Sequence, residues 1–330
     1  MTHPYRLGFA VKVLGGGGLA TSDTRRWQSG PHLSRSLELL GPVLDHLERI
    51  DVRMFRLSSS TIPYGTHPDL PDLHFRRQLD ECRDALDTLA ARVRSLGLRL
   101  STHPGQYTVL NSADPDLTAR SAADLEQDTA LLDALGAGPD GVVVVHVGGL
   151  YGDRPSALDR WAAAYERLSD RARERVALEN DDGPFGVDDV MELHRRTGVR
   201  VVYDHHHHRT SAASVDLPPA EAFARTYATW PDGVRPKVHL SSPRVDLEIA
   251  DRRRAGSRRV EKVPVVPRLT PHADFVSPWD LVDLLRSAPG PVDVMLEAKA
   301  KDLALQHARD ALARLFPALA AAEERASRTC

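Results

Sequence analysis

The stretch Val142-Val143-Val144-Val145-His146 consists of four consecutive valines followed by a histidine. A strand with one face in water alternates apolar and polar side chains, whereas a strand covered on both faces can be apolar throughout. β-Branched residues such as valine also favour extended backbone. This stretch therefore predicts a strand over Val142–Val147 that is buried on both faces, of the kind found in parallel sheets that are flanked by helices.

Seven further short runs along the chain have the same strand-like character. They are Arg6–Val11, Val52–Leu57, Leu98–Thr102, Arg175–Leu178, Arg200–Tyr203, Lys237–Leu240 and Val292–Leu296. Longer amphipathic stretches separate the strands, and the clearest helical patterns cover Asp80–Leu96, Ala122–Leu135, Ala157–Ala172, Val187–Thr197 and Leu217–Tyr227. Strand and helix alternate eight times, which predicts a closed parallel (β/α)8 TIM barrel.

The remaining segments favour a barrel over its structural rival, a doubly wound open sheet. The glycine run Gly15–Gly18 follows the first strand, but it lacks the helix-opening GxGxxG spacing of a nucleotide-binding sheet. Two long polar segments, at about 14–31 and 241–278, look like irregular loops rather than domain boundaries. We therefore predict a single TIM-barrel domain over residues 1–330.

The composition excludes several functional classes. The chain is 42% hydrophobic with a formal net charge of −3, which supplies a core and gives no global mark of a nucleic-acid binder. Only Cys82 and Cys330 are present, so we expect no structural disulfide and a reducing cytoplasm. No stretch has the pattern of a signal peptide or a membrane span. We expect a cytoplasmic protein without membrane association or an obligate protein partner.

Metal-binding side chains fall at or near the predicted carboxyl ends of six strands. They are His103, His146, Glu179, Asp204, His239 and Glu297. The carboxyl ends of barrel strands converge on one mouth, so these residues are expected to meet at the C-terminal face of the strands. Imidazole and carboxylate ligands suit divalent cations such as Zn and Mn. The number of ligands exceeds what one ion needs, which predicts a site with two or three ions, as recurs where phosphodiester bonds are broken.

Each of these residues also has an ordinary structural interpretation. A single histidine at a strand end is commonly a hydrogen-bonded structural residue, and a single carboxylate can cap the next helix. Their joint occurrence at six strand ends favours a metal site. His67 and His272 could join the ring from loops. Five other histidines are expected at the surface: His32, His46, His74, His194 and His307.

Short motifs occur in order along nearly the whole chain. They are Phe55–Ser60, Thr66–Pro68, His103–Tyr107, His146–Gly152, Leu178–Asp182, Asp204 with the histidines after it, Pro236–Pro243, His272–Asp274 and Glu297–Asp302. Each motif alone is weak, but together they span about Leu7 to Leu305, and the sequence resembles the UV damage endonuclease family. The resemblance implies a (β/α)8 barrel that binds up to three divalent metal ions, commonly manganese.

The resemblance also implies a set of ligands and catalytic residues. The implied metal ligands are His67, His103, His146, Glu179, Asp204, His207, His239, His272 and Glu297. Among the four consecutive histidines, the family spacing selects His207, with His206 and His208 as alternatives. Lys237 matches a family lysine that is carboxylated at the metal site, and a carbamate would offer a cation an anionic oxygen. Catalytic roles are implied for Glu179, Lys237 and His239.

The family cuts the backbone of double-stranded DNA immediately 5′ of UV photoproducts, and the resemblance implies the same activity here. Gln106, Tyr107 and Phe9 match family positions at the DNA, although Tyr107 can equally be a packing aromatic. Eversion of a damaged nucleotide costs less than eversion of an intact one. One departure concerns the first strand, after which the family carries an Asn that helps to wedge the duplex. Ala10–Leu14 contains no Asn, and the first Asn of the chain is Asn111.

Two alternatives follow from this departure. The first is a related multi-metal barrel enzyme that acts on a small-molecule substrate, such as a biosynthetic oxidase or an isomerase-like enzyme. The second is a DNA- or metal-binding protein without catalytic activity. A wide groove with a basic rim would distinguish the endonuclease from an enzyme with a closed apolar pocket. Arg252–Arg254 and Arg258–Arg259 would add phosphate contacts, or would belong to a solvated loop.

Overall fold

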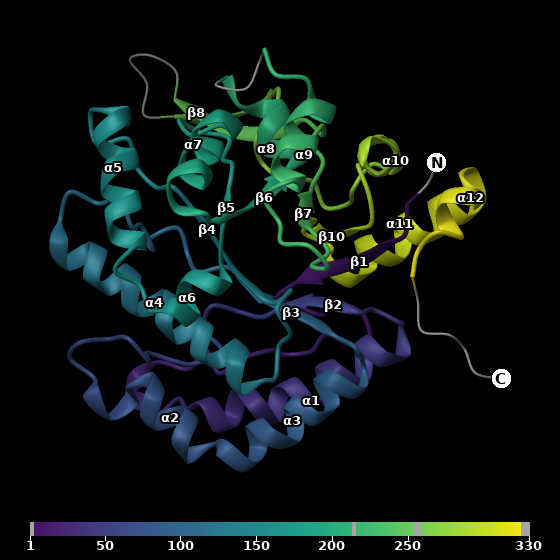
Figure 1. Cartoon of the computed structure of the whole chain (residues 1–330). Coiled ribbons are helices and arrows are strands. Elements are labelled where there is room, and N and C mark those ends of the chain that lie inside the picture. Colours follow the sequence, from purple (N-terminus) through teal and green to yellow (C-terminus); the bar gives the residue numbers. More distant parts are fainter. Residues whose placement is uncertain (1–2, 213–215, 254–258, 325–330) are drawn as a thin grey trace.

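The computed structural model describes residues 3–212, 216–253 and 259–324, and its elements are labelled in Figure 1. Eight parallel strands form a closed barrel in the order β1-β10-β7-β6-β5-β4-β3-β2. Their bounds are β1 (Tyr5–Ala10), β2 (Met54–Arg56), β3 (Arg99–Thr102), β4 (Val142–His146), β5 (Val176–Glu179), β6 (Arg200–Asp204), β7 (Lys237–Leu240) and β10 (Val292–Leu296). The predicted TIM barrel is confirmed, and each predicted strand overlaps an observed one.

Helices connect the strands and cover the outside of the barrel (Figure 1). They are α1 (Leu33–Arg49), α2 (Phe75–Glu81), α3 (Arg83–Ser95), α4 (Pro115–Ala134), α5 (Arg154–Tyr165), α6 (Asp170–Arg175), α7 (Val187–Thr197), α8 (His205–Thr210), α9 (Pro219–Tyr227), α10 (Pro278–Ser287), α11 (Lys301–Leu315) and α12 (Pro317–Ala320), with 3-10 turns η1 (Trp27–Ser29) and η2 (Pro71–Leu73). Their apolar faces and the outward side chains of the strands form one continuous core. No helix within the described residues has both the length and the apolar character that a membrane span requires.

The helical pattern predicted over Asp80–Leu96 is divided in the structure. α2 ends at Glu81 and α3 begins at Arg83, because Cys82 between them adopts φ −107° and ψ 13°. The prediction of one helix was therefore wrong at this point. Cys82 is buried and forms no disulfide, while Cys330 lies outside the described residues.

Side chains alternate between the inside and the outside of the barrel along each strand. On β5, Ala177 packs with residues of neighbouring strands in a cluster that is separate from the outer core. Glu179 lies on the same side of the strand, two residues later. The same relation links Val202 to Asp204 on β6. The carboxylates are therefore the last inward-facing residues of their strands, at the carboxyl end of the barrel.

Phe9 on β1 points in the opposite direction. Ala10 packs with Met54 and Met295 in an inner cluster, so Phe9, one residue away, points outward into the core beneath the helices. Its ring is completely buried, with its centroid 5.3 Å from that of Phe55. The contact between Phe9 and DNA that the family resemblance implied is therefore not available in this structure, because Phe9 is a core residue.

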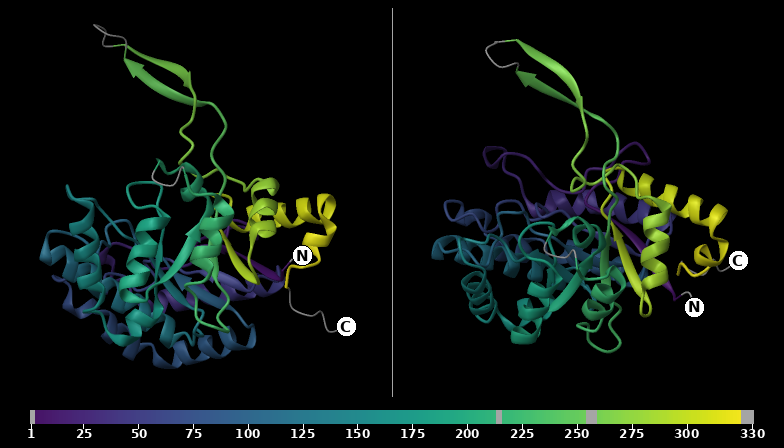
Figure 2. Two further views of the ribbon diagram at one scale, coloured as in Figure 1. Left: turned by 45° about the horizontal axis from the view of Figure 1, so that its top comes forward. Right: turned by 90° about the horizontal axis from the view of Figure 1, so that it is seen from above.

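The segment 241–278, predicted to be an irregular loop, contains a β-hairpin. Its strands β8 (Glu248–Arg253) and β9 (Val260–Val265) form a separate antiparallel sheet, and Figure 2 shows the hairpin standing away from the barrel. Three of the six residues of β9 are valines, and β-branched residues favour strands. The neighbouring arginines obscured this signal in the sequence, and two of them, Arg254 and Arg258, lie outside the described residues.

The predicted loop at 14–31 is held against the barrel by Asp302. The Asp302 carboxylate accepts hydrogen bonds from the backbone amides of Leu14 and Gly15 at 2.8 and 3.0 Å, and lies 3.0 Å from Nε2 of His46. His46 is buried, so the prediction that it lies at the surface was wrong. Its polar partner is 256 residues away in the sequence, which helical periodicity does not reveal.

Candidate metal centre at the carboxyl end of the barrel

Glu179, the last residue of β5, lies at the centre of a cluster of histidines. Its side chain is fully buried, and its Oε2 lies 3.1 Å from Nε2 of His103 and 3.6 Å from Nε2 of His146. Its Oε1 lies 2.7 Å from Nδ1 of His239 and 3.6 Å from Nδ1 of His207. The four histidines come from four different barrel units, so closure of the barrel brings them together.

A second carboxylate, Glu297, follows β10 and extends the cluster. Its Oε1 lies 3.3 Å from Nδ1 of His239, and its Oε2 lies 3.9 Å from Nδ1 of His272. Two groups of side chains each offer ligand atoms within 4.8 Å of one another: His103, His146 and Glu179 form the first, and Glu179, Asp204, His239 and Glu297 form the second. Glu179 belongs to both groups, a position suited to a ligand shared by two ions.

The short helix α8 determines which of the histidines after β6 lies in the cluster. Asp204 is the N-cap of α8, and its carboxylate accepts a hydrogen bond from the backbone amide of His207 at 2.7 Å. The Nδ1 atom of His207 lies 3.7 Å from the other oxygen of Asp204. The rings of His206 and His208 are instead within 3.0 Å of the carbonyl oxygens of Thr270 and Leu217. Of the three alternatives, the structure places His207 in the cluster.

His67 lies apart from the cluster. It is exposed in the segment that follows β2, its Nδ1 accepts a hydrogen bond from the backbone amide of Asp69, and its ring centroid is 6.2 Å from that of Tyr64. His67 belongs to neither group of clustered ligand atoms within the described residues. Of the other eight ligands implied by the family resemblance, six belong to these groups, and the other two lie beside them: His207 is 3.6 Å from Glu179 and His272 is 3.9 Å from Glu297.

Arg56 is a site residue that sequence reasoning missed. It is the last residue of β2 and forms an ion pair with Glu297. Burial would raise the pKa of Glu297, but Arg56 and the neighbouring histidines together outweigh it and hold that pKa well below its ordinary value. The position of Arg56 at a strand carboxyl end was the available signal, although only histidines and carboxylates suggested a site in the sequence.

Burial controls the protonation of the cluster. The pKa of Glu179 is raised well above its ordinary value, first by burial and then by the negative charge of Glu297. Burial also lowers the pKa of His103 and His239 well below the ordinary value, and lowers that of His146 to about 4. These three imidazoles are therefore neutral at physiological pH, which is the form that binds a cation.

The donor set fits a divalent cation. Among the described residues, Oδ2 of Asp204, Nδ1 of His146 and Nε2 of His239 are buried without a hydrogen-bond partner, although buried polar groups are normally paired. A cation would satisfy the carboxylate oxygen and offset the repulsion between Glu179, Asp204 and Glu297. Imidazoles and carboxylates without thiolates are ligands that suit Mn and Zn.

Lys237 lies one layer deeper in the barrel, two residues before His239 on β7. Its side chain is fully buried, and its Nζ donates a hydrogen bond to Oγ of Ser101 at 2.9 Å. Burial, followed by the charges of Arg56 and Arg99, lowers the pKa of Lys237 well below its ordinary value. Lys237 therefore loses its proton more readily than an ordinary lysine, and it lies beneath the cluster, where an ammonium group would repel a bound cation.

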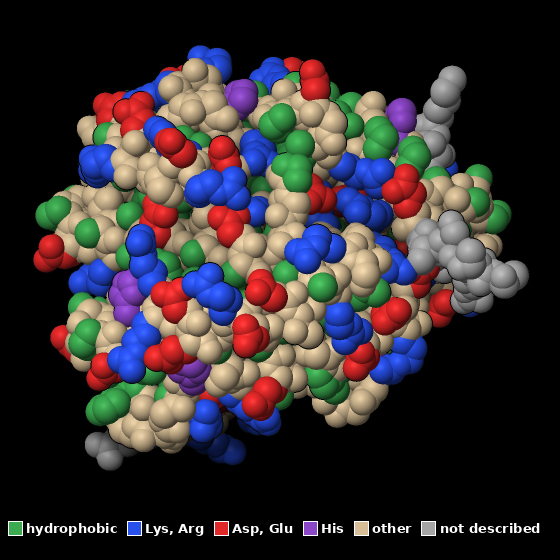
Figure 3. All heavy atoms as spheres, turned by 60° about the horizontal axis from the view of Figure 1, so that its bottom comes forward, with side chains coloured by type: hydrophobic (Ala, Val, Ile, Leu, Met, Phe, Trp, Pro, Cys, Tyr) green, Lys and Arg blue, Asp and Glu red, His purple; other side chains and the backbone are tan. Residues whose placement is uncertain are grey.

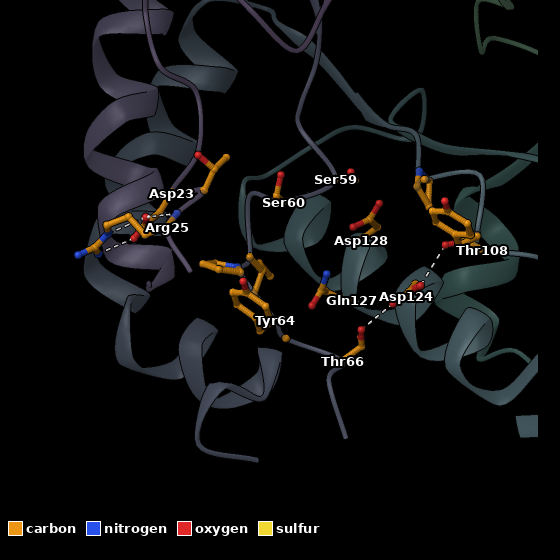
Figure 4. A pocket seen from close by; sticks show the side chains of 17 residues that line it. Asp23, Arg25, Ser59, Ser60, Tyr64, Thr66, Thr108, Asp124, Gln127 and Asp128 are labelled. Atoms are coloured by element: carbon orange, nitrogen blue, oxygen red, sulfur yellow. Dashed lines mark hydrogen bonds and ion pairs between the residues drawn. The ribbon is translucent and has the colours of Figure 1, made fainter. Parts of the chain in front are cut away.

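The loop after β3 presents polar and aromatic groups to solvent. Gln106 is exposed, and Tyr107 is 79% exposed. Tyr107 lines a pocket of about 410 Å³ formed by the segments after β1, β2 and β3 and by α4 (Figure 4). In its wall Asp124 accepts hydrogen bonds from Oγ1 of Thr66 at 2.6 Å and Oγ1 of Thr108 at 3.0 Å. Polar and apolar side chains both line the pocket.

The fold and the cluster together define a class of protein, a (β/α)8 barrel with a candidate multi-metal centre at the carboxyl end of its strands. The model of one protein family, UV-endonuclease UvdE, matches residues 34–320. The match covers well over half of the chain. The chain therefore belongs to the UV-endonuclease UvdE family.

Individual relatives agree with this assignment. The UV DNA damage endonuclease of Bacillus velezensis (strain DSM 23117 / BGSC 10A6 / LMG 26770 / FZB42) is 32% identical over 284 residues, covering 83% of this chain and 78% of the relative. The crystal structure of SacUVDE matches with a TM-score of 0.76 and 24% identity, covering 94% of this chain and 99% of that one. Endonuclease IV from Thermus thermophilus matches with a TM-score of 0.56 and 16% identity over the same shares. At these identities, the two structures support the fold alone.

Proposed function

We propose that this protein is a DNA repair endonuclease that nicks double-stranded DNA immediately 5′ of UV photolesions and requires divalent metal ions. Membership of the UvdE family supports an endonuclease that acts on damaged DNA. The observation that carries the metal requirement is the position of Glu179, whose two oxygens lie within 2.7 to 3.6 Å of nitrogens from four histidines. A small-molecule substrate is less well supported, because the matching family and the similar relatives are described as UV DNA damage endonucleases.

Up to three ions would be held at the mouth of the barrel, with manganese as the candidate metal. The ligands would be His103, His146, Glu179, Asp204, His207, His239, His272 and Glu297, joined by His67 if its exposed loop closes on the cluster. A bound divalent cation supplies the positive charge that polarises a phosphoryl oxygen and activates water at neutral pH. Hydrolysis then needs no nucleophile from the protein.

Two cationic residues of the chain adjust the charge of this site. Arg56 keeps Glu297 ionised through their ion pair, so that Glu297 is ready to bind a cation. Lys237 would become an anionic oxygen ligand if its amine were carboxylated. The hydroxyl of Ser101, 2.9 Å from Nζ of Lys237, would then hydrogen bond to the carbamate.

Recognition of the lesion would depend on the loop after β3. Gln106 and Tyr107 are exposed there, and a solvent-facing tyrosine ring can stack on a base exposed by eversion of the lesion. The chain has no Asn in Ala10–Leu14 and Phe9 is buried, so the first strand would contribute little to the wedge. The loop after β3 would therefore carry more of the lesion recognition.

The direct test compares UV-irradiated and unirradiated labelled duplexes with protein supplied with Mn. We expect strand breaks immediately 5′ of the lesions in the irradiated duplex only. Equal cutting of both duplexes, or cutting of neither, would reject the repair function. A chelator should abolish the cutting, and full activity in the chelator would reject the metal requirement.

A further inference from the structure

The β8–β9 hairpin is rooted beside the candidate metal centre. Its two legs are paired at the base, where Pro243 forms a bridge with His272 and the amide of Arg244 donates to the carbonyl of Pro271 at 3.1 Å. His272 in turn lies 3.9 Å from the Glu297 carboxylate. The hairpin therefore rises from the carboxyl face of the barrel, the face that carries the candidate site, and extends away from it (Figure 2).

One face of the hairpin is uncovered. Directly opposite residues of an antiparallel pair share a face, and this face carries Ile249, Asp251, Arg253, Val260, Lys262 and Pro264. All six residues are exposed, and Ile249 is 63% exposed. A two-stranded hairpin on its own is at best marginally stable in water. An exposed hairpin face that carries both cationic and apolar side chains therefore suggests a surface that binds a partner molecule.

Positive charge is concentrated in the stretch of sequence that joins the two strands of the hairpin. Residues 252–259 contain five arginines and no Asp or Glu, although the whole chain has a net charge of −3. The nearest acidic residues, Asp251 and Glu261, lie opposite Lys262 and Arg252. On the face of the molecule seen in Figure 3, Lys and Arg side chains are interspersed with Asp and Glu. The basic end of the hairpin is a local feature that matches a polyanion.

Duplex DNA suits this hairpin better than a second copy of the chain. Pairing of its strands with another sheet edge is disfavoured by Pro264 within β9 and by the charges on both strands. Two basic ends would also repel each other. The major groove of B-DNA is about 12 Å wide and admits a two-stranded ribbon, whose strands lie about 4.8 Å apart.

We propose that the β8–β9 hairpin is a DNA-binding arm that enters the major groove beside the cleavage site, with Arg253 and Lys262 on the uncovered face and Arg252 on the opposite face contacting backbone phosphates. This proposal rests on the proposed function, because it requires DNA at the mouth of the barrel. Strands of six residues span roughly 20 Å, so the arm reaches beyond the lesion along about half a helical turn. It contributes to binding and takes no part in bond cleavage.

The test compares two triple variants of the full chain on duplexes that extend about two helical turns, roughly 20 base pairs, on either side of one lesion. The arm variant is Arg252→Gln, Arg253→Gln and Lys262→Gln. The matched control is Arg94→Gln, Arg195→Gln and Arg314→Gln, three exposed cations in the last turns of α3, α7 and α11, at the amino end of the barrel. For each protein, affinity for intact duplex is measured as a function of salt, and KM and kcat are measured on lesion duplex.

We expect the arm variant to lower the slope of log affinity against log salt by about 2–3, since each lost phosphate contact removes about 0.9. Its KM should rise while kcat stays unchanged, because the lost contacts are formed equally in ground and transition states. The control should match the wild type in both measurements. A salt slope of the arm variant equal to that of the wild type overturns the proposal.

A second variant guards against misfolding of the first. Replacing residues 248–265 by a short Gly-Ser linker keeps the paired base at Pro243 and His272, and it should reproduce the loss of slope while still nicking lesion duplex at low salt. If this deletion instead converts a dimer to a monomer in sedimentation and leaves the slope unchanged, the arm binds a second copy and the proposal is wrong. Failure of the wild type to nick irradiated DNA would reject the proposed function, whereas the salt slope on intact duplex still decides whether the arm binds DNA.

Discussion

Nδ1 of His239 lies 2.7 Å from Oε1 of Glu179, and both side chains are completely buried. This pair joins the two groups of ligand atoms, because Glu179 belongs to both and His239 also lies 3.3 Å from Glu297. Glu179 is buried beside the neutral imidazoles of His103, His146 and His239 and near two further carboxylates, so its negative charge is poorly compensated. The pKa of Glu179 is raised, first by burial and then by the charges of the neighbouring carboxylates, because its ionised form is poorly stabilised. The site therefore favours binding of a cation.

The first prediction concerns Glu179→Gln. The amide keeps the volume of the side chain but replaces an anionic oxygen shared by both ligand groups. Because residues that merely orient metal ligands already contribute about 10–100-fold, we expect nicking to fall by more than about 100-fold. The control is Glu166→Gln, which changes an exposed glutamate after α5 and should keep full activity. Wild-type activity in the Glu179 variant would remove this residue from the centre.

The second prediction concerns the effect of metal on stability. A ligand that binds only the folded state at 100 times its Kd stabilises that state by about 2.7 kcal/mol. Saturating Mn should therefore raise the Tm by several degrees, and a chelator should reverse the shift. Differential scanning calorimetry of wild type and Glu179→Gln provides the check. An equal Mn-dependent shift in both proteins would place the stabilising ion elsewhere.

The third prediction separates neighbouring histidines of α8. His207→Gln should reduce the number of bound Mn ions and the rate of nicking, because His207 is the member of the run that lies near Glu179 and Asp204. His206→Gln should retain bound metal, because the His206 ring is 3.0 Å from the carbonyl of Thr270 and can be replaced by another hydrogen-bonding group. Metal content is measured by mass spectrometry of the purified variants. The reverse order of losses would assign the ligand to His206.

Much of this centre could be predicted from the sequence because barrel geometry is strict. A buried parallel strand appears as an apolar run, and its last inward residue must lie at the common mouth. His146, directly after four valines, shows this most clearly. No knowledge of side-chain packing is needed to place such a residue. Selecting His207 from the four histidines also requires the start of helix α8, which the Asp204 N-cap determines.

Other features depended on information that local sequence does not contain. Both faces of β1 are buried, so apolarity alone cannot tell whether Phe9 or Ala10 points inward. The burial of His46 depends on Asp302, which is distant in sequence. The structure also leaves His67 exposed, although its motif matches the family. Loops are less constrained than strands, which is why loop-borne features were the hardest to place.

The fourth prediction concerns the amino end of the barrel, where Asp293 is fully buried. Its carboxylate lies 2.8 Å from nitrogens of both Arg99 and Arg6. Breaking such a buried pair leaves uncompensated cations, so Asp293→Asn should destabilise the fold by about 3–5 kcal/mol in urea unfolding at neutral pH. Asp140→Asn is the control, because Asp140 is 27% exposed and 3.6 Å from Arg6, and it should lose less than about 1 kcal/mol.

The same pair predicts a pH dependence. Burial would raise the pKa of Asp293, but the charges of Arg99 and Arg6 outweigh it and lower that pKa below its ordinary value. The stabilisation is therefore fully present above the unfolded pKa of about 3.9 and is lost as the pH falls through the lower folded pKa. The difference in unfolding free energy between wild type and Asp293→Asn should shrink at strongly acidic pH. A difference that grows on acidification would contradict this sign.

The fifth prediction concerns Tyr107, which is 79% exposed beside the pocket of Figure 4. A side chain this exposed contributes little to the core, so Tyr107→Ala should leave the Tm nearly unchanged. If its ring stacks on a base at the lesion, the variant should lose about 1–3 kcal/mol of binding to lesion duplex. Binding to undamaged duplex should change less, and Tyr107→Phe should keep the affinity because the stacking ring remains. Equal losses on damaged and undamaged duplex would mean that Tyr107 contacts DNA without sensing damage, and lesion selectivity would then have to come from other residues of the mouth.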